Sequence, residues 1–295
     1  MRKTKNAYIL SLLVFISLLL SFYFKEDSLG GGEIDYLFHE KFITKFFIDF
    51  KSTFAEYGHG DLYARNSPIF YIFLSFFLKF GLSLEYIWVP NLILIPSFFL
   101  IFAKCLKLKY PTISKESLFL LCSIIFLSPS IRTMLVWTYP FIWALFFFLI
   151  SIYYYLKFQL SKDTNSQIKF SILNIIFIAL SSYITPNFAI FSLFYFYLFL
   201  KSINLKRIII LLLFINIILA APAFIYYYIN DFYIFKVNVL TDVKNQIKYN
   251  LANKFLIILS LLFFYSLPIF LKLKFNDLSN SFGKLYVPII LFLIC

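Results

Sequence analysis

Long apolar runs constrain the fold of this chain more than any other feature of the sequence. Of its 295 residues, 62% are hydrophobic and only 14% are charged, whereas soluble domains carry about 25% charged residues. A soluble protein has no place to bury so much apolar surface, but a lipid bilayer accommodates it. A spanning helix needs roughly 20 apolar residues. The sequence therefore predicts an all-α, polytopic transmembrane helical bundle.

About nine spans are expected, with the last one truncated at Cys295. The predicted spans are 7–24, 87–103, 118–131, 138–156, 170–184, 188–200, 208–228 and 255–271, and a last run begins near 285. We interpret residues 1–295 as a single integral membrane domain. Within it, 7–24 is a signal anchor, 25–86 is a large external loop of catalytic type, and 87–295 is a helical bundle.

The N-terminus carries the features of a signal anchor. Arg2, Lys3 and Lys5 precede an apolar core that runs from Ala7 to Phe24. This core exceeds the 7–15 residues of a usual signal-peptide core, and no small-residue cleavage site follows it. We therefore expect an uncleaved first helix.

The basic residues indicate which loops face the cytoplasm. More than half of the 27 lysines and arginines lie in five short segments: the N-terminus, 104–117, 157–169, 201–207 and 272–284. Short cytoplasmic loops of membrane proteins are enriched in these residues. The sequence thus predicts a multi-pass protein of a bacterial inner membrane with a cytoplasmic N-terminus.

The apolar stretch 67–82 has two interpretations. If it spans the membrane, segment 104–117 and the basic segments after it face outward, against the charge rule. If it lies in the outer interface as a juxtamembrane or re-entrant helix, every basic segment faces inward. The stretch is short for a span and has Lys79 near its end, which favours the interfacial placement.

The external loop is acidic. Segment 25–66 holds 8 of the 14 carboxylates and has a net charge of −3. The high pI therefore arises elsewhere, in loops that face anionic lipid, and no motif suggests a nucleic-acid partner. A glycine turn at 30–32 precedes an acidic stretch, 33–40, and then apolar residues at helical spacing over 41–57. We expect an amphipathic helix on the outer membrane surface.

A carboxylate at head-group depth suits chemistry on a lipid-linked phosphate. It can take the proton from an acceptor hydroxyl or bind a divalent metal. Asp35 is the candidate base and possible metal ligand, with Glu33 as a helper. Arg65 and Arg132 are candidate phosphate binders, because guanidinium matches phosphate geometry. Alternatively, the carboxylates pair with lysines of the loop, and Arg132 extends to lipid head groups.

Four short stretches resemble the GT-C superfamily of membrane glycosyltransferases. Gly32-Glu33-Ile34-Asp35-Tyr36 is similar to the acidic motif after the first helix, and 66–71 to the proline-containing hairpin that follows. Residues 104–109 resemble the basic cytoplasmic turn, and 127–137 the Ser-Pro…Arg…Trp stretch of bacterial members. No carboxylate follows Trp137 closely, which departs from the family pattern and puts a two-carboxylate metal site in doubt.

This resemblance implies transfer of a sugar from a polyprenyl-phosphate carrier to a glycan, lipid or protein at the outer face. Asp35 is then base or metal ligand, and no other cofactor is indicated. Two other interpretations remain: a flippase, transporter or O-antigen-polymerase-type protein, and an inactive scaffold of the same fold. The position of 67–82 discriminates between the first two classes, since a surface hairpin favours the transferase and a span the transporter.

Overall fold

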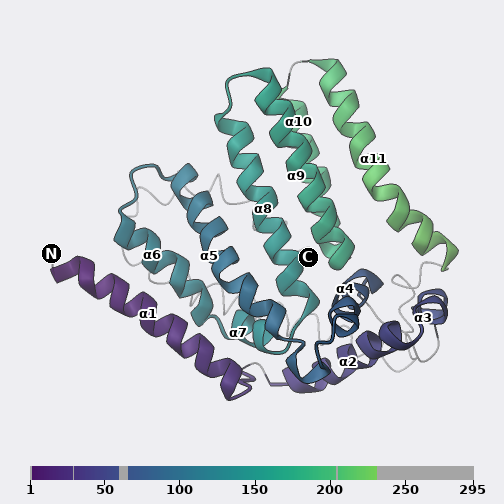
Figure 1. The fold of residues 1–295 in the computed structure, drawn as a ribbon. Coiled ribbons are helices and arrows are strands. Elements are labelled where there is room, and N and C mark those ends of the chain that lie inside the picture. The colour runs from purple at the N-terminus through teal and green to yellow at the C-terminus, as the bar shows by residue number, and fades with distance from the viewer. Residues whose placement is uncertain (1, 29, 60–65, 204, 231–295) are drawn as a thin grey trace, which may run out of the picture. The chain divides into compact units, whose positions relative to one another are not determined.

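The computed structural model describes residues 2–28, 30–59, 66–203 and 205–230, all within one compact unit, Met1–Phe235. Helices account for 84% of these residues, and the described part contains no strand, so the all-α prediction is confirmed there. The long helices are α1 (Arg2–Tyr23), α5 (Val89–Lys109), α8 (Pro140–Leu160), α9 (Thr164–Ile184) and α11 (Lys206–Ile229) (Figure 1).

Five helical segments in the described ranges are long and apolar enough to cross a membrane. A sixth is possible if α6 (Lys115–Ile124), the 3-10 turn η3 (Ile125–Leu127) and α7 (Pro129–Val136) count as one bent span. Five of the predicted spans, 7–24, 87–103, 138–156, 170–184 and 208–228, overlap the five long segments. The runs at 255–271 and from 285 lie outside the described residues.

Two predicted spans differ from the structure. The helix expected over 118–131 bends by 68° between Leu127 and Pro129, because Ser128 is extended (φ −62°, ψ 122°) and a residue before proline disfavours the helical region. The helix α10 (Ile190–Ser202) has 13 residues. At 1.5 Å per residue it is about 20 Å long, well short of the roughly 30 Å apolar core of a bilayer.

The long helices alternate in direction. Helices α8 and α9 form an antiparallel hairpin, in which Ser181 donates to the carbonyl of Ala144 (2.8 Å) and Asn174 to that of Ser151 (2.8 Å). Helix α5 packs along α8. Helix α11 packs against α9, and α10 contacts both (Figure 1).

Helix α1 runs parallel to the bent segment α6–η3–α7. Tyr8 packs against Phe119, and Phe15 against Phe126, so both segments advance in the same direction. The N-terminus therefore lies at the same end of the helices as the connection after α5. The basic connections after α8 and α10 lie at this end too (Figure 1). The positive segments in the described part thus gather at one end, as the charge rule requires of loops that share a compartment.

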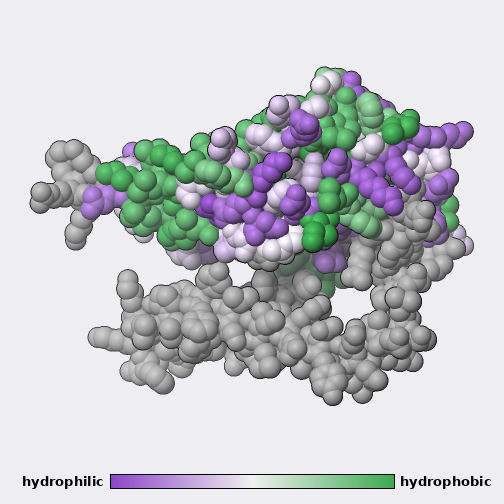
Figure 2. All heavy atoms as spheres, turned by 90° about the horizontal axis from the view of Figure 1, so that it is seen from below, coloured by the Kyte–Doolittle hydropathy of each residue, from purple (hydrophilic) through white to green (hydrophobic). Residues whose placement is uncertain are grey.

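A layer of short helices lies at the opposite end. It contains α2 (Gly32–Ile48), α3 (Phe50–Glu56), α4 (Pro68–Lys79) and the 3-10 turns η2 (Leu84–Tyr86) and η4 (Pro186–Ala189). Helix α2 packs on α4, and α4 contacts α9. Figure 2 views this end: hydrophilic residues cross the middle of the surface, and hydrophobic residues cover the side on which α1 lies.

The predicted surface helix over 41–57 begins earlier and is broken. Helix α2 starts at Gly32 because the Asp27 carboxylate accepts hydrogen bonds from the amides of Gly31 (2.8 Å) and Gly32 (2.7 Å), which caps the helix. A break follows at Asp49, whose carboxylate accepts from the Ser52 amide (3.1 Å) and starts α3. The first turn of α2, with Glu33 and Asp35, is therefore helical.

The apolar face of α2 packs against protein. Phe42, Ile43 and Phe46 are fully buried and lie in one cluster with Phe70 and Tyr71 of α4. Their spacing of three to four residues forms one helical face. Phe42 and Phe46, two of the aromatic residues that predict a membrane-surface helix, thus join α2 to α4, whereas Phe47 on the same helix is exposed. The opposite face still exposes apolar side chains such as Ile34 and Leu37.

Helix α4 corresponds to the stretch 67–82. Ser67 caps it, Pro68 occupies its first turn, and Gly81 follows its end with a φ of +91°. Its 12 residues make it about 18 Å long, too short to cross a bilayer. The placement of this helix at the outer interface stays a prediction.

Candidate functional site

Two cavities adjoin the first turn of α2. Glu33 lines the first and Asp35 the second. In an α-helix, side chains two positions apart point in roughly opposite directions. The residues predicted to act together on one group are therefore directed to different cavities, because the acidic motif is helical.

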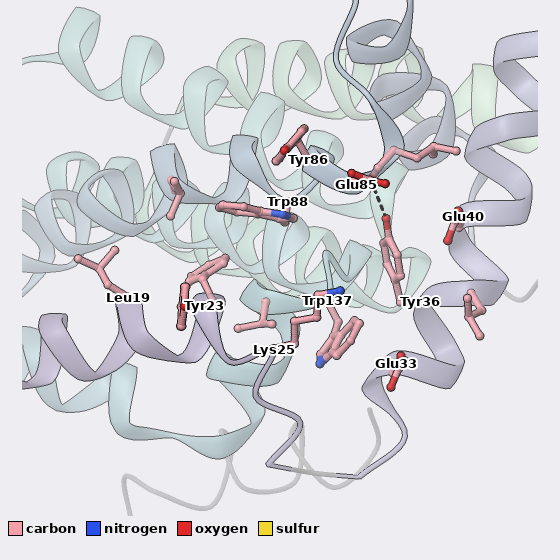
Figure 3. Close-up of a pocket in the computed structure, with 15 residues that line it drawn as sticks. Leu19, Tyr23, Lys25, Glu33, Tyr36, Glu40, Glu85, Tyr86, Trp88 and Trp137 are labelled. Atoms are coloured by element: carbon pink, nitrogen blue, oxygen red, sulfur yellow. Dashed lines mark hydrogen bonds between the residues drawn. The ribbon is translucent and has the colours of Figure 1, made fainter.

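The first cavity has a volume of about 700 Å³ and combines aromatic rings with charged groups. Its carboxylates are Glu33, Glu40 and Glu85, and its cation is Lys25. The aromatic residues that line it include Tyr23, Tyr36, Tyr86, Trp88 and Trp137, which come from α1, α2, η2, the start of α5 and the segment after α7 (Figure 3). Rings with nearby polar groups suit a ligand that has both an apolar and a hydroxylated face.

Tyr36 fixes one wall of this cavity. Its hydroxyl donates to the carbonyl of Leu84 at 3.3 Å, and its ring packs against that of Trp137 with 5.9 Å between the ring centroids (Figure 3). Burial, and secondarily the charge of Glu40, raises the pKa of the Tyr36 hydroxyl. Tyr36 therefore stays neutral and acts in this wall as a hydrogen-bond donor.

An apolar groove adjoins the first cavity. It has a volume of about 450 Å³ and is lined by Phe15, Leu18, Leu19, Leu92, Ile95, Pro96, Phe99, Leu100 and Phe119. Leu19 of α1 and Leu92 of α5 line both spaces. A cavity with polar groups at the end of the long helices thus lies next to an apolar groove between those helices. This arrangement suits an amphiphile with a polar head and a hydrocarbon tail.

The second cavity is smaller, about 540 Å³, and is lined by Asp35, Phe38, His39, Asn66, Tyr71, Tyr139, Pro140, Phe141, Thr185 and Asn187. Tyr139 donates a short hydrogen bond to the Asp35 carboxylate. The His39 ring packs edge-on against the ring of Tyr139, with 5.1 Å between the ring centroids. These contacts connect α2 to the start of α8.

Buried polar groups behind Asp35 form a hydrogen-bonded chain. His39 Nδ1 lies 2.9 Å from the Tyr71 hydroxyl, and the Asn66 amide donates to that hydroxyl at 3.3 Å. Burial lowers the pKa of His39 to about 4, although the Asp35 charge acts in the opposite direction. Burial raises the pKa of Tyr71 to about 12. Both side chains are therefore neutral near pH 7.

Arg132 lies in an ion pair between two distant parts of the chain. Its Nε donates to both oxygens of the Glu26 carboxylate (3.0 and 2.9 Å), and Nη2 makes a further short contact with the same group. Nη1 and Nη2 donate to the Ser17 hydroxyl and carbonyl at 2.9 and 3.1 Å. The hydrogen bond from Arg132 lowers the pKa of Glu26. In this structure the guanidinium therefore joins α1 to α7 and is directed at Glu26, whereas the sequence predicts a phosphate contact.

The remaining predicted site residues have different outcomes. Arg65, the other predicted phosphate binder, lies outside the described residues. For Asp35, the possible metal ligand, the described ranges contain no group of three His, Cys, Asp or Glu side chains placed to hold a metal ion.

Sequence reasoning missed most of the second cavity. Tyr139 lies just beyond the Ser-Pro…Arg…Trp stretch and therefore falls outside that motif. Thr185 and Asn187 flank Pro186 in a segment whose sequence indicates an ordinary turn between helices. His39 lies one helical turn after Asp35, and this spacing of four was the one signal that placed both on the same face of a helix.

No protein-family model, curated protein or solved structure matches this chain. The function is therefore inferred from the residues of the two cavities and the groove.

Proposed function

We propose that this protein is a membrane glycosyltransferase that transfers a sugar from a polyprenyl-phosphate-linked donor to a glycan, lipid or protein acceptor. The reaction takes place at the outer face of the bacterial inner membrane. The observation that carries the proposal is that the first cavity and the apolar groove are neighbours with two lining residues in common, Leu19 and Leu92. A lipid-linked sugar has the same two parts in the same order.

The donor occupies these two spaces. Its hydrocarbon chain lies in the groove, where the lining residues are apolar. Its sugar lies among the rings and carboxylates of the first cavity, where Glu33 and Glu40 accept hydrogen bonds from hydroxyl groups. Lys25 supplies a positive charge at the same cavity, suited to the phosphate.

Asp35 is the general base. Its carboxylate takes the proton from an acceptor hydroxyl while that oxygen bonds to the anomeric carbon of the sugar. The bond between this carbon and the phosphate oxygen breaks, and the electron pair leaves with the polyprenyl phosphate. Tyr139 orients the carboxylate by donating to one of its oxygens. The reaction requires the reacting end of the sugar to extend from the first cavity past the first turn of α2, so that its anomeric carbon meets an acceptor oxygen held by Asp35 in the second cavity.

A flippase, transporter or O-antigen-polymerase-type protein is the alternative from the sequence. The feature that separates the classes is the stretch 67–82, and the 12-residue length of α4 supports the transferase. The packing of α4 against α2 supports it too, since the hairpin then belongs to the same layer as Asp35.

The test uses the full-length protein, purified in detergent, with short-chain polyprenyl-phosphate mannose and polyprenyl-phosphate glucose as probes. Membrane extracts supply acceptors, and release of polyprenyl phosphate is followed. We expect the wild type to release polyprenyl phosphate and Asp35→Asn to release it at a rate lower by 100-fold or more, because general bases accelerate reactions by about 10²–10⁴-fold. Glu56→Gln, on an exposed residue of α3, is the matched control. Equal release by wild type and Asp35→Asn removes Asp35 from the mechanism.

A further inference from the structure

The second cavity contains two buried polar atoms that lack a partner within the described part of the chain. They are Nε2 of His39 and Oγ1 of Thr185, on side chains that are only 6% and 8% exposed. Both residues line the cavity. Buried polar groups are nearly always hydrogen-bonded, and an orphaned one costs about 1–3 kcal/mol. The cavity therefore offers two unused hydrogen-bonding positions to a ligand.

The hydrogen bond behind His39 leaves two tautomers open to its ring. The Tyr71 hydroxyl accepts from the Asn66 amide and has two lone pairs and one proton, so it can either donate to His39 Nδ1 or accept from it at 2.9 Å. With its proton on Nε2 the neutral ring offers the cavity a donor, and with its proton on Nδ1 it offers an acceptor. The atom without a partner is therefore served in both cases by a ligand group that both donates and accepts.

The charges at the cavity select among ligand classes. Asp35 repels a phosphate, and the described residues that line the cavity include no lysine or arginine. An ammonium group has donors only, so it pairs with His39 Nε2 in one tautomer alone. A hydroxyl group both donates and accepts, so it pairs with Nε2 in either tautomer, and it can also donate to Asp35 or to Thr185 Oγ1. Hydroxyl groups satisfy the cavity in both tautomers, which charged groups do not.

We propose that this cavity binds an uncharged, hydroxyl-bearing part of the acceptor, a glycan residue, with His39 and Thr185 as its hydrogen-bonding contacts. As an assignment of the acceptor class the inference rests on the proposed function, whereas the binding itself does not require transfer. The volume of about 540 Å³ suits a ligand of this size, since ligand pockets measure about 300–1,000 Å³. Asn187 lies at the same cavity and supplies further donors and acceptors.

The experiment compares three probes that share one ring and differ in charge: methyl glucoside, glucosamine and glucose 6-phosphate. Binding to the full chain is measured by the saturation transfer of NMR signal to each probe and by titration. We expect methyl glucoside to bind at least tenfold more tightly than the other two. Glucose 6-phosphate binding best, or no probe binding, overturns the proposal.

Two variants tie the binding to the cavity. His39→Phe keeps a ring and removes the ring nitrogens, and Thr185→Val keeps the shape and removes the hydroxyl. Each should weaken methyl glucoside binding about tenfold while the circular dichroism signal of the helices stays unchanged. The control Glu56→Gln should leave methyl glucoside binding unchanged. Unaltered binding by both folded variants overturns the proposal, and Thr185→Val decides alone if His39→Phe does not fold. If sugar binding depends on these residues but wild type releases no polyprenyl phosphate, the proposed function fails and the binding site stands.

Discussion

The two cavities beside the first turn of α2 differ in how they treat polar groups. On the Glu33 side, three carboxylates and a lysine share an aromatic-lined space. On the Asp35 side, one carboxylate lies in front of a neutral, buried chain of His39, Tyr71 and Asn66. The two carboxylates of one short acidic motif thus lie in two different environments, because a helix directs residues two positions apart to opposite sides.

Exchanging the two carboxylates for amides tests this comparison with the largest expected effect. Asp35→Asn should lower the rate of sugar transfer by 100-fold or more, since it removes the proposed base. Glu33→Gln should change the donor KM less than tenfold and leave kcat near wild type, because it alters one hydrogen bond to the donor. Steady-state kinetics separates the two, and equal losses in kcat contradict the division of roles.

The stability of the fold between pH 6.5 and 4 should depend on His39 in the second cavity. The pKa of His39 falls from 6.5 to about 4 on folding, so the unfolded chain takes up the proton first. Stability is then complete above about pH 6.5 and declines as the pH falls toward 4, by about 1–3 kcal/mol at 1.36 kcal/mol per pKa unit.

Thermal unfolding in detergent between pH 7 and 4 measures this decline for wild type and His39→Phe. The variant should lose most of the dependence between pH 6.5 and 4. A variant curve as steep as that of the wild type contradicts a neutral, buried His39.

The ion pair between Arg132 and Glu26 should matter for stability. Arg132→Ala leaves Glu26 without its ion-pair partner and removes the contacts to Ser17, so the free energy of unfolding should fall by about 2 kcal/mol. Arg207→Ala, on an exposed residue of α11, is the control, and it should lower the free energy of unfolding by less than about 0.5 kcal/mol. Chemical unfolding in mixed micelles compares them, and equal stability would show that the ion pair contributes nothing.

Substitutions at two glycines, Gly32 at the start of α2 and Gly81 after α4, compare a steric contact with backbone strain, and the second has the smallest expected effect. A Cβ added at Gly32 would lie 2.7 Å from both Thr133 Cγ2 and Trp137 Cδ1, so Gly32→Ala should cost about 1–3 kcal/mol through overpacking. Gly81 has a φ of +91° but open space around it, and Gly81→Ala should cost about 1 kcal/mol from backbone strain alone. The melting temperatures of the two variants measure the difference. If Gly81→Ala melts at a lower temperature than Gly32→Ala, the close contact between α2 and α7 is contradicted.

The position of the site along the chain was predictable, but its shape was not. The acidic stretch after the first helix is visible as composition and spacing alone. The bonds of Asp35 to Tyr139 and of Arg132 to Glu26 join residues 104 and 106 positions apart, and no local pattern encodes such a distance. Arg132 is therefore identifiable as an unusual charge at a membrane boundary, while its partner is not.

The all-α class and the concentration of positive charge in a few short connections were predictable from the amino-acid sequence. These properties follow from hydropathy and from local helix periodicity, which depend on neighbouring residues. The bend within 118–131, the packing of the aromatic face of α2 on α4, and the separate cavities of Glu33 and Asp35 became visible in the fold alone. Those outcomes depend on which surfaces meet in three dimensions, because packing between distant segments selects among conformations that local preferences leave open.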